Sequence, residues 1–360
     1  MLRSLKIENF RCFQNFELQE LGQVNLLVGT NNSGKTSVLD AVKILMSSFD
    51  LETLKQVMAG RGEYVWDAGS KREFDIRHLF YGHTLQINHK LLITSDNGTD
   101  SGFIELFIEE IDLKQGNRFE NPEDFKELAL MIKRSNQNES LKLSLSAKQG
   151  LAYLYPSVRS ARRDFRDPES NAKVQYVTSS ALTPQTMISL FDQLILTPEE
   201  DLVIESLRTI EPTIKRIAPS PDGSRFGDRC GFWVQFSGHD QRVPIGSLGD
   251  GIWRMLGLTL ALVNARGGIL LIDEIDTGLH FTVMADLWKL IWETAKRLDV
   301  QVFATTHNSD CWTSLATIAN LENPSREGIT IHRIEKDKPH SILFTEREIA
   351  IAANRGIEVR

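Results

Sequence analysis

Three short apolar runs dominate the hydrophobic pattern of the chain. Residues 24–28 (VNLLV) precede a glycine, residues 269–272 (ILLI) precede two acids, and residues 300–307 (VQVFATTH) end in two threonines and a histidine. Strands buried on both faces of a parallel sheet have this near-continuous apolar pattern. The runs therefore predict the centre of an α/β sheet, with polar residues at the strand ends where ligands bind in such sheets.

Helical spacing predicts the elements that pack on this sheet. Residues 37–46 carry an apolar stripe, and residues 252–262 are nearly all apolar, which predicts a buried helix. Residues 184–216 are also helical in pattern, with Thr-Pro pairs at 183–184 and 197–198 as typical helix starts. We therefore expect a helical lobe in the middle of the chain.

Strand-like segments dominate the first part of the chain. Asn97-Gly98 with Gly102 predicts a hairpin between two of them. The segments that read as strands are 1–8, 85–88, 91–94, 103–108 and 151–156. Together they predict an antiparallel β lobe.

The residues after the first apolar run fit a phosphate-binding loop. Residues 29–36 (GTNNSGKT) match G-x-x-x-x-G-K-[ST] at every fixed position, between a strand and a helix. Glycines let backbone N–H groups face an anion, and the helix N-terminus adds partial positive charge. Lys35 is expected to reach the β- and γ-phosphates of ATP and Thr36 to ligate Mg²⁺, whereas a chance glycine-rich turn is the disfavoured alternative. The residues expected to hold the nucleotide here are Gly29, Asn31, Asn32, Ser33, Gly34, Lys35, Thr36 and Ser37.

Polar residues at the ends of the other two runs predict catalytic groups. Asp273 is placed to hold Mg²⁺, directly or through water, and Glu274 to orient or deprotonate the attacking water. Alone, this pattern also fits a strand that ends in a solvated acidic turn. His307 is placed to donate a hydrogen bond to the γ-phosphate, although a lone histidine is more often structural. The phosphate loop favours the catalytic interpretation of the two acids, and the position of His307 after a core strand favours that of the histidine.

A second anion-binding helix start is predicted at residues 247–251 (SLGDG). The alternative is an ordinary N-cap by Ser247 or Asp250. The order of phosphate loop, long insertion, Ser-x-Gly-x-Gly helix, acidic strand end and histidine is that of ABC-type ATPases. In that class this helix closes on the ATP of the other subunit, so Ser247 and Gly249 are expected to act across a head-to-head homodimer.

With these elements placed, the chain resembles the RecF/SMC/OLD branch of ABC ATPases, and most of all the OLD-like ATPases. Residues 5–13 (LKIENFRCF) look like the first strand of that branch, and residues 273–280 (DEIDTGLH) look like its Walker B and D-loop. Ile275 and Phe281 stand where the branch has proline, which concerns the shape of the loop rather than its acids. The resemblance also implies that Arg11 lies near the nucleotide.

The resemblance covers residues 1–47 and 243–320. It implies an α/β fold, an ABC-type P-loop NTPase head with a mixed central sheet, an N-terminal antiparallel β lobe and a helical insertion. The expected division is 1–155 for the N-terminal part of the head, 156–228 for the helical insertion lobe, and 229–360 for the C-terminal part of the head.

Two specialised forms of this branch are not expected. Long SMC-type arms need a heptad repeat, which is absent, and prolines punctuate the insertion. These prolines are Pro156, Pro168, Pro184, Pro198 and Pro212. The stretch after His307 is too short for the Toprim nuclease of OLD proteins.

The implied function is an ATPase switch in DNA repair or anti-phage defence that controls a separately encoded effector, such as a Toprim-type nuclease. Two other interpretations remain open. One is an ATP-dependent binding scaffold with negligible turnover, and the other is a RecF-like repair factor that binds DNA.

Composition narrows these interpretations. The chain is 41% hydrophobic and 25% charged, begins without a signal-peptide pattern, and has no apolar run that reaches a membrane span of ~20 residues. Three distant cysteines, Cys12, Cys230 and Cys311, argue against a disulfide scaffold or a zinc site and for the cytoplasm.

Charge leaves the question of DNA open. A net charge of −7 gives no general attraction to DNA. A local cluster of arginines is either a solvated loop or a phosphate site; its members are Arg159, Arg162, Arg163 and Arg166. No spacing supports Gln86 as the glutamine that contacts the metal in ABC ATPases, and no aromatic residue can be assigned to adenine.

Overall fold

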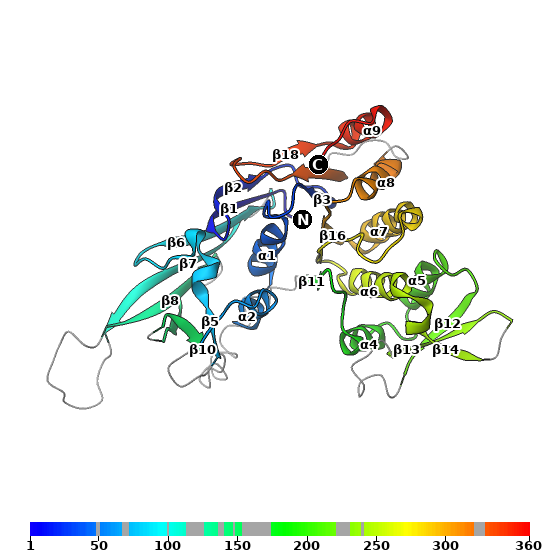
Figure 1. Cartoon of the computed structure of the whole chain (residues 1–360), viewed down its shortest axis with the longest axis horizontal. Helices are drawn as coiled ribbons and strands as arrows, with labels where there is room; N and C mark the ends of the chain where they lie inside the picture. The colour runs from blue at the N-terminus through cyan, green and yellow to red at the C-terminus, as the bar shows by residue number, and fades with distance from the viewer. Residues whose placement is uncertain are drawn as a thin grey trace.

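The computed structural model describes most of the chain. The described residues are 1–47, 51–66, 72–98, 101–112, 126–135, 140–146, 148–152, 174–220, 231–238, 241–319 and 328–360. Figure 1 shows a central layer of strands and helices between two outlying parts, an antiparallel sheet on one side and a mixed helix–strand lobe on the other.

The central sheet has the strand order β11-β15-β16-β3-β17-β18. All neighbours are parallel except β17 and β18, so the sheet is mixed. Its strands are β11 (Val174–Val177), β15 (Ile269–Ile272), β16 (Gln301–Thr305), β3 (Val24–Val28), β17 (Ile329–Arg333) and β18 (Ile342–Phe344). The three predicted apolar runs are thus the adjacent strands β3, β16 and β15, and their carboxyl ends lie at one edge.

Alternate residues of these strands belong to two different cores. Leu26 and Leu270 pack with helices on one face, and Leu27 and Leu271 pack with α1 and the antiparallel lobe on the other. This two-sided burial explains why the strands are almost continuously apolar, and the polar exceptions Asn25 and Gln301 are buried with hydrogen-bond partners. The helices of the first face are α6 (Asp250–Asn264), α7 (Met284–Leu298), α8 (Ser309–Ala319) and α9 (Glu346–Arg355), and α1 is Lys35–Met46.

The predicted antiparallel β lobe is present, with the strand order β2-β1-β6-β7-β8-β9. The predicted hairpin at Asn97-Gly98 joins β6 to β7, where Asp96 pairs with Ser101. The strands are β2 (Phe13–Leu18), β1 (Ser4–Phe10), β6 (Lys90–Asp96), β7 (Ser101–Asp112), β8 (Lys126–Arg134) and β9 (Leu141–Ser144). Beside them lie α2 (Leu51–Ala59) and a small sheet of β10 (Gly150–Ala152), β5 (Arg72–Asp75) and β4 (Tyr64–Trp66).

One predicted strand of this lobe is wrong. Residues 85–88 form no strand, because the segment between the short 3-10 turn Tyr81–His83 and β6 is irregular. Ile87 is 49% exposed and Asn88 has a φ of 63°, so the alternation in the sequence does not correspond to a buried face. The expected strand at 151–156 is present only as β10, and its later residues lie outside the described part of the chain.

The expected helical lobe over 156–228 differs from the structure in two respects. Helices α4 (Pro184–Asp192) and α5 (Pro198–Arg208) begin at the predicted Thr-Pro pairs, but β11 belongs to the central sheet. The helical pattern up to residue 216 is wrong, because β12 (Ile214–Pro219) pairs with β13 (Phe232–Phe236). A register shift between Ile214 and Arg216 explains the error, since an extra residue in a strand gives buried positions a helix-like spacing of three.

A buried histidine in β17 makes stability depend on pH. His332 is fully buried, its ring nitrogens lie 3.1 Å from Thr330 Oγ1 and 3.0 Å from Ser341 Oγ, and burial lowers its pKa to about 3. The unfolded chain, with an ordinary histidine pKa of about 6.5, therefore binds a proton that the folded chain does not between about pH 3 and 6.5. Stability from this group is complete at neutral pH and is lost as the pH falls.

We expect His332→Gln to reduce the acid sensitivity of folding. The free energy of unfolding of the parent should fall by up to about 1.4 kcal/mol per pH unit more than that of the variant between about pH 6 and 4. Urea unfolding across this range measures the difference, and His340→Gln, at an exposed position, is the matched control. Equal slopes for parent and His332→Gln would refute the assignment.

Candidate nucleotide site

The predicted phosphate loop joins β3 to α1 at the carboxyl edge of the central sheet. Gly29 and Gly34 have φ values of 144° and 106°, a conformation that side chains rarely adopt. A Cβ atom on Gly29 would lie 2.5 Å from the Ile334 carbonyl oxygen, and one on Gly34 would lie 2.4 Å from Phe13 Cζ. Helix α1 begins without a side-chain cap, so its first N–H groups stay available to an anion.

Two side chains of the loop fit a bound phosphate. Lys35 Nζ donates to the carbonyl oxygens of Gly29 at 2.8 Å and Thr30 at 2.9 Å, and within the described chain it forms no ion pair with a carboxylate. Burial lowers its pKa, which an anion beside it would reverse. The hydroxyl of Ser33 is buried and has no hydrogen-bond partner in the described structure. A cation without a counterion and an unsatisfied hydroxyl are the groups that a phosphate would satisfy.

Side-chain oxygen atoms from α1, from the residue after β15 and from β16 converge beside the loop. Thr36 Oγ1 donates to Asp273 Oδ1 at 3.1 Å, and Thr305 Oγ1 donates to the same oxygen at 2.7 Å. Mg²⁺ in nucleotide sites takes one or two protein oxygens and completes its shell with phosphate and water. The pair of Thr36 and Asp273 therefore fits the metal role predicted for it.

Glu274 and His307 lie together at the open side of this group. Glu274 Oε1 is 3.9 Å from His307 Nδ1, and both side chains are about half exposed, at 43% and 51%. Glu274 has a φ of 48°, which is uncommon for a residue other than glycine, and its N–H donates to Thr305 Oγ1 at 2.8 Å. Thr277 Oγ1 donates to the second oxygen of this carboxylate at 3.3 Å. The two predicted catalytic side chains thus face the same space from neighbouring strand ends.

An arginine that the sequence interpretation missed fixes the backbone of both acids. Arg254 Nη2 donates to the carbonyl oxygens of Asp273 at 3.0 Å and Glu274 at 2.9 Å, and Nη1 donates to that of Thr178. The side chain is only 3% exposed and projects from α6. The available signal was a single charged residue within the nearly apolar stretch 252–262, because such a charge is buried only when it is paired.

Arg11 lies beside the phosphate loop, and its charge is compensated by acidic neighbours. It lines the hollow of about 720 Å³ around the loop. Its guanidinium pairs with Glu63 and, through Nε at 3.3 Å, with Asp40, which also accepts from Arg61 at 2.7 Å. Arg11 is 6% exposed, so the contact with a nucleotide stays a prediction.

The same hollow has lining residues that the sequence did not indicate. Tyr81 and His83 approach the loop from the segment before β6, and Lys336 and Asp337 approach from the turn after β17. Tyr81, 40% exposed, is an aromatic side chain that lines this hollow. Gln86 is not among the lining residues. No local spacing marks these positions, because only the tertiary fold brings them to the loop.

The predicted second helix start lies away from this hollow. Gly249, with a φ of 93°, precedes α6, and the helix has no side-chain cap. Ser247 lies in the 3-10 turn Ile245–Leu248 and donates to the Pro244 carbonyl oxygen at 2.7 Å, so it is not the ordinary N-cap. Ser247 and Gly249 are both exposed, and neither lines the hollow around the loop.

Two sequence-based expectations concern residues outside the described part of the chain. The arginine cluster 159–166 and Cys230 lie outside the described residues. In the part that the structure describes, no helix combines the length and apolarity required to cross a membrane.

Comparison with known proteins gives a consistent picture. A protein-family model described as "AAA domain, putative AbiEii toxin, Type IV TA system" matches residues 24–310. An ATP/GTP phosphatase of Helicobacter pylori (strain ATCC 700392 / 26695) is 22% identical over 334 residues, 86% of each chain. The OLD nuclease of Thermus scotoductus (strain ATCC 700910 / SA-01) is 22% identical over 326 residues, which are 86% of this chain and 59% of that protein.

Among solved structures, the fold matches an SMC head. The crystal structure of the SmcHead bound to the C-winged helix domain of ScpA aligns with a TM-score of 0.50 and 12% identity. The match covers 96% of this chain and 98% of that chain. At this identity it shows a common fold, which is the fold that the sequence predicts.

Proposed function

Because the chain belongs to this AAA family and is a P-loop ATPase related to OLD nuclease, we propose that it binds and hydrolyses ATP and closes head to head on it. The switch would act in DNA repair or anti-phage defence by controlling a separately made effector, such as a Toprim-type nuclease. One observation carries the proposal: Lys35, Thr36, Asp273 and Glu274 line one hollow beside the phosphate loop, with His307 3.9 Å from Glu274, while Ser247 and Gly249 stand exposed outside that hollow.

Each residue around the loop would have a separate role in hydrolysis. Lys35, Ser33 and the first N–H groups of α1 would hold the β- and γ-phosphates, and Thr36 and Asp273 would hold Mg²⁺. The metal would counter the negative charge that develops on the phosphates. Glu274 accepts a proton from the attacking water, and His307 donates a hydrogen bond to the γ-phosphate.

The exposed start of α6 supports the proposed dimer. The N–H groups at the start of α6 have no side-chain cap and attract an anion. The residues proposed to bind phosphate within the same subunit lie elsewhere, around the phosphate loop. In a head-to-head dimer the γ-phosphate of one subunit would meet Ser247 and Gly249 of the other. Hydrolysis removes this shared anion, so the pair would loosen.

We expect Ser247→Arg to prevent dimerisation without preventing nucleotide binding. With Mg²⁺ and the non-hydrolysable analogue AMP-PNP, the parent should shift in light scattering from 40.7 kDa to twice that mass, and the variant should remain a monomer. In the dimer, the larger side chain would block the phosphate held by the partner subunit, whereas the phosphate loop of the same subunit is unchanged. Binding of a fluorescent nucleotide should therefore change less than about threefold.

Thr313→Arg is the control, because Thr313 is exposed on α8 and lies outside the hollow around the loop. It should dimerise like the parent. A parent that stays monomeric at saturating analogue would contradict the head-to-head proposal.

The effector is proposed from the family resemblance. A pull-down with the ATP-bound protein from the cells that make it should return a nuclease-like protein. Recovery of no such protein under both ATP and ADP would count against this part of the proposal.

A further inference from the structure

A small sheet distant from the phosphate loop has one open face. Strands β12, β13 and β14 (Arg242–Pro244) form it in that order. Ile217, Phe232 and Val234 are buried on its inner face, where they belong to the helical core. The other face borders a hollow of about 930 Å³. This sheet face is therefore a surface rather than part of the core.

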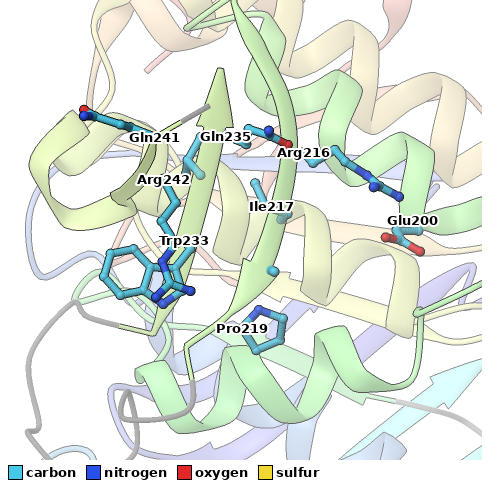
Figure 2. Close-up of a pocket in the computed structure, with 10 residues that line it drawn as sticks. Glu200, Arg216, Ile217, Pro219, Trp233, Gln235, Gln241 and Arg242 are labelled. Atoms are coloured by element: carbon cyan, nitrogen blue, oxygen red, sulfur yellow. The ribbon is translucent and has the colours of Figure 1, made fainter. Parts of the chain in front are cut away.

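Cross-strand pairing places polar and aromatic side chains in two rows on this open face. Arg216, Gln235 and Arg242 form one row, in which Gln235 pairs with both arginines. The next row is Ala218, Trp233 and Pro244. Figure 2 shows Trp233 and Arg242 against each other, with Arg216 directed toward Glu200 at the opposite side of the hollow.

The charge of this face is opposite to that of the whole chain. Its three strands contain Lys215, Arg216 and Arg242 and no acidic residue, whereas the chain has a net charge of −7. Neither Arg216 nor Arg242 forms an ion pair within the described structure, and the Arg242 guanidinium lies 4.8 Å from the centre of the Trp233 ring. The acid at the rim, Glu200, already accepts the Leu196 N–H at 2.9 Å.

We propose that this open face, defined by Arg216, Trp233, Gln235 and Arg242, binds single-stranded nucleic acid. A base would stack on the Trp233–Arg242 pair, and the two arginines would contact phosphates of the same strand. Arg216 and Arg242 stand two strands apart, about 10 Å, so they reach different phosphates. Unpaired bases offer the exposed ring faces that such aromatic and basic platforms bind.

The Trp233–Arg242 pair favours a single strand over a duplex. Stacking on this pair needs a base whose ring faces are free, whereas the bases of a duplex already stack on one another. Acidic side chains of α5, including Asp201 and Glu205, line an adjoining hollow beyond Arg216. Arg208 and Lys215 line the same hollow and balance these acids, so the basic surface of β12–β14 is the part that favours the strand.

Fluorescence anisotropy with a labelled 20-nucleotide mixed-sequence DNA tests the proposal on the full chain. Trp233→Ala should weaken binding by about 5- to 140-fold, which is the loss of stacking for one base. Arg216→Gln with Arg242→Gln should lower the slope of log K against log salt by about 1.4, because two phosphate contacts are lost.

The control changes the same charge elsewhere. Lys289→Gln with Arg297→Gln, both exposed on α7, should leave affinity and salt slope within twofold of the parent. Thermal midpoints verify that each variant is folded, and the arginine variant tests the face even if Trp233→Ala is unstable.

Three outcomes would overturn the proposal. The parent does not bind the oligonucleotide, both face variants bind like the parent, or the control loses as much affinity as they do. Binding of a poly-glutamate peptide without binding of DNA would instead identify the face as a site for acidic proteins. The test requires no ATP, so its result is independent of the switch proposed above.

Discussion

Glu274→Gln is expected to lower ATP turnover by at least about 100-fold while leaving ATP binding intact, because a positioned general base contributes that much or more. Glutamine keeps the size of the side chain and can still accept a hydrogen bond from Thr277. It cannot take a proton from water at neutral pH. The variant should therefore hold unhydrolysed ATP and accumulate as the closed dimer.

Turnover and mass measured together make this result decisive. Phosphate release should be slow in Glu274→Gln, and light scattering with ATP and Mg²⁺ should show the doubled mass that the parent shows only briefly. Glu293→Gln, exposed on α7, is the control and should behave like the parent.

Other outcomes separate the competing functions. Negligible turnover in the parent and in Glu274→Gln, together with tight ATP binding, would favour a scaffold over an ATPase switch. Equal and substantial turnover in both proteins would exclude Glu274 as the base.

Arg254→Lys should lower the rate constant of hydrolysis by about 10- to 100-fold and change nucleotide affinity little. Arg254 holds the carbonyl oxygens of Thr178, Asp273 and Glu274 with one planar group, and lysine cannot reproduce that fork. A displacement of about 1 Å at the acids is sufficient for such a loss. The loop that binds the phosphates has no contact with Arg254 among those described, so its affinity should persist.

A lower rate constant of hydrolysis with unchanged nucleotide affinity would indicate that Arg254 positions the two acids, whereas a general disruption of the fold would lower both. Arg254→Met should in addition lose stability, because buried carbonyl groups without partners cost about 1–3 kcal/mol each. Arg266→Lys, at an exposed ion pair with Glu199, is the control for an arginine-to-lysine change. A variant Arg254→Lys with parental rate, or one with rate and affinity lowered equally, would remove the positioning role.

The sequence predicts those parts of the site that depend on neighbours along the chain. Gly29 to Thr36, Asp273, Glu274 and His307 each follow a buried strand, and the edge common to β3, β15 and β16 brings them together. Their geometry agrees with the predicted roles, which remain proposals. The central strands and the antiparallel lobe were predictable because their residues are largely apolar or alternate, whereas the mixed character of the central sheet was implied by the family resemblance.

The parts that were missed depend on tertiary contacts or on local irregularity. Arg254 reaches the acids from another element, and Tyr81 lines the hollow around the loop from a short 3-10 turn. The register shift in β12 gave Ile214 and Ile217 the spacing of a helix. Residues 85–88 alternate in hydrophobicity without a buried face, so pattern alone could not exclude a strand.

The position of β3 has a consequence for how the protein is made. On the sheet it lies between β16 and β17, whose residues Val302 and Ile329 both pair with Val24. A ribosome that adds about 5–20 residues per second needs roughly 15–55 s after completing β3 before β16 exists. During that time an apolar strand lacks both partners, so the nascent chain depends on chaperones or on early packing of the antiparallel lobe to avoid aggregation.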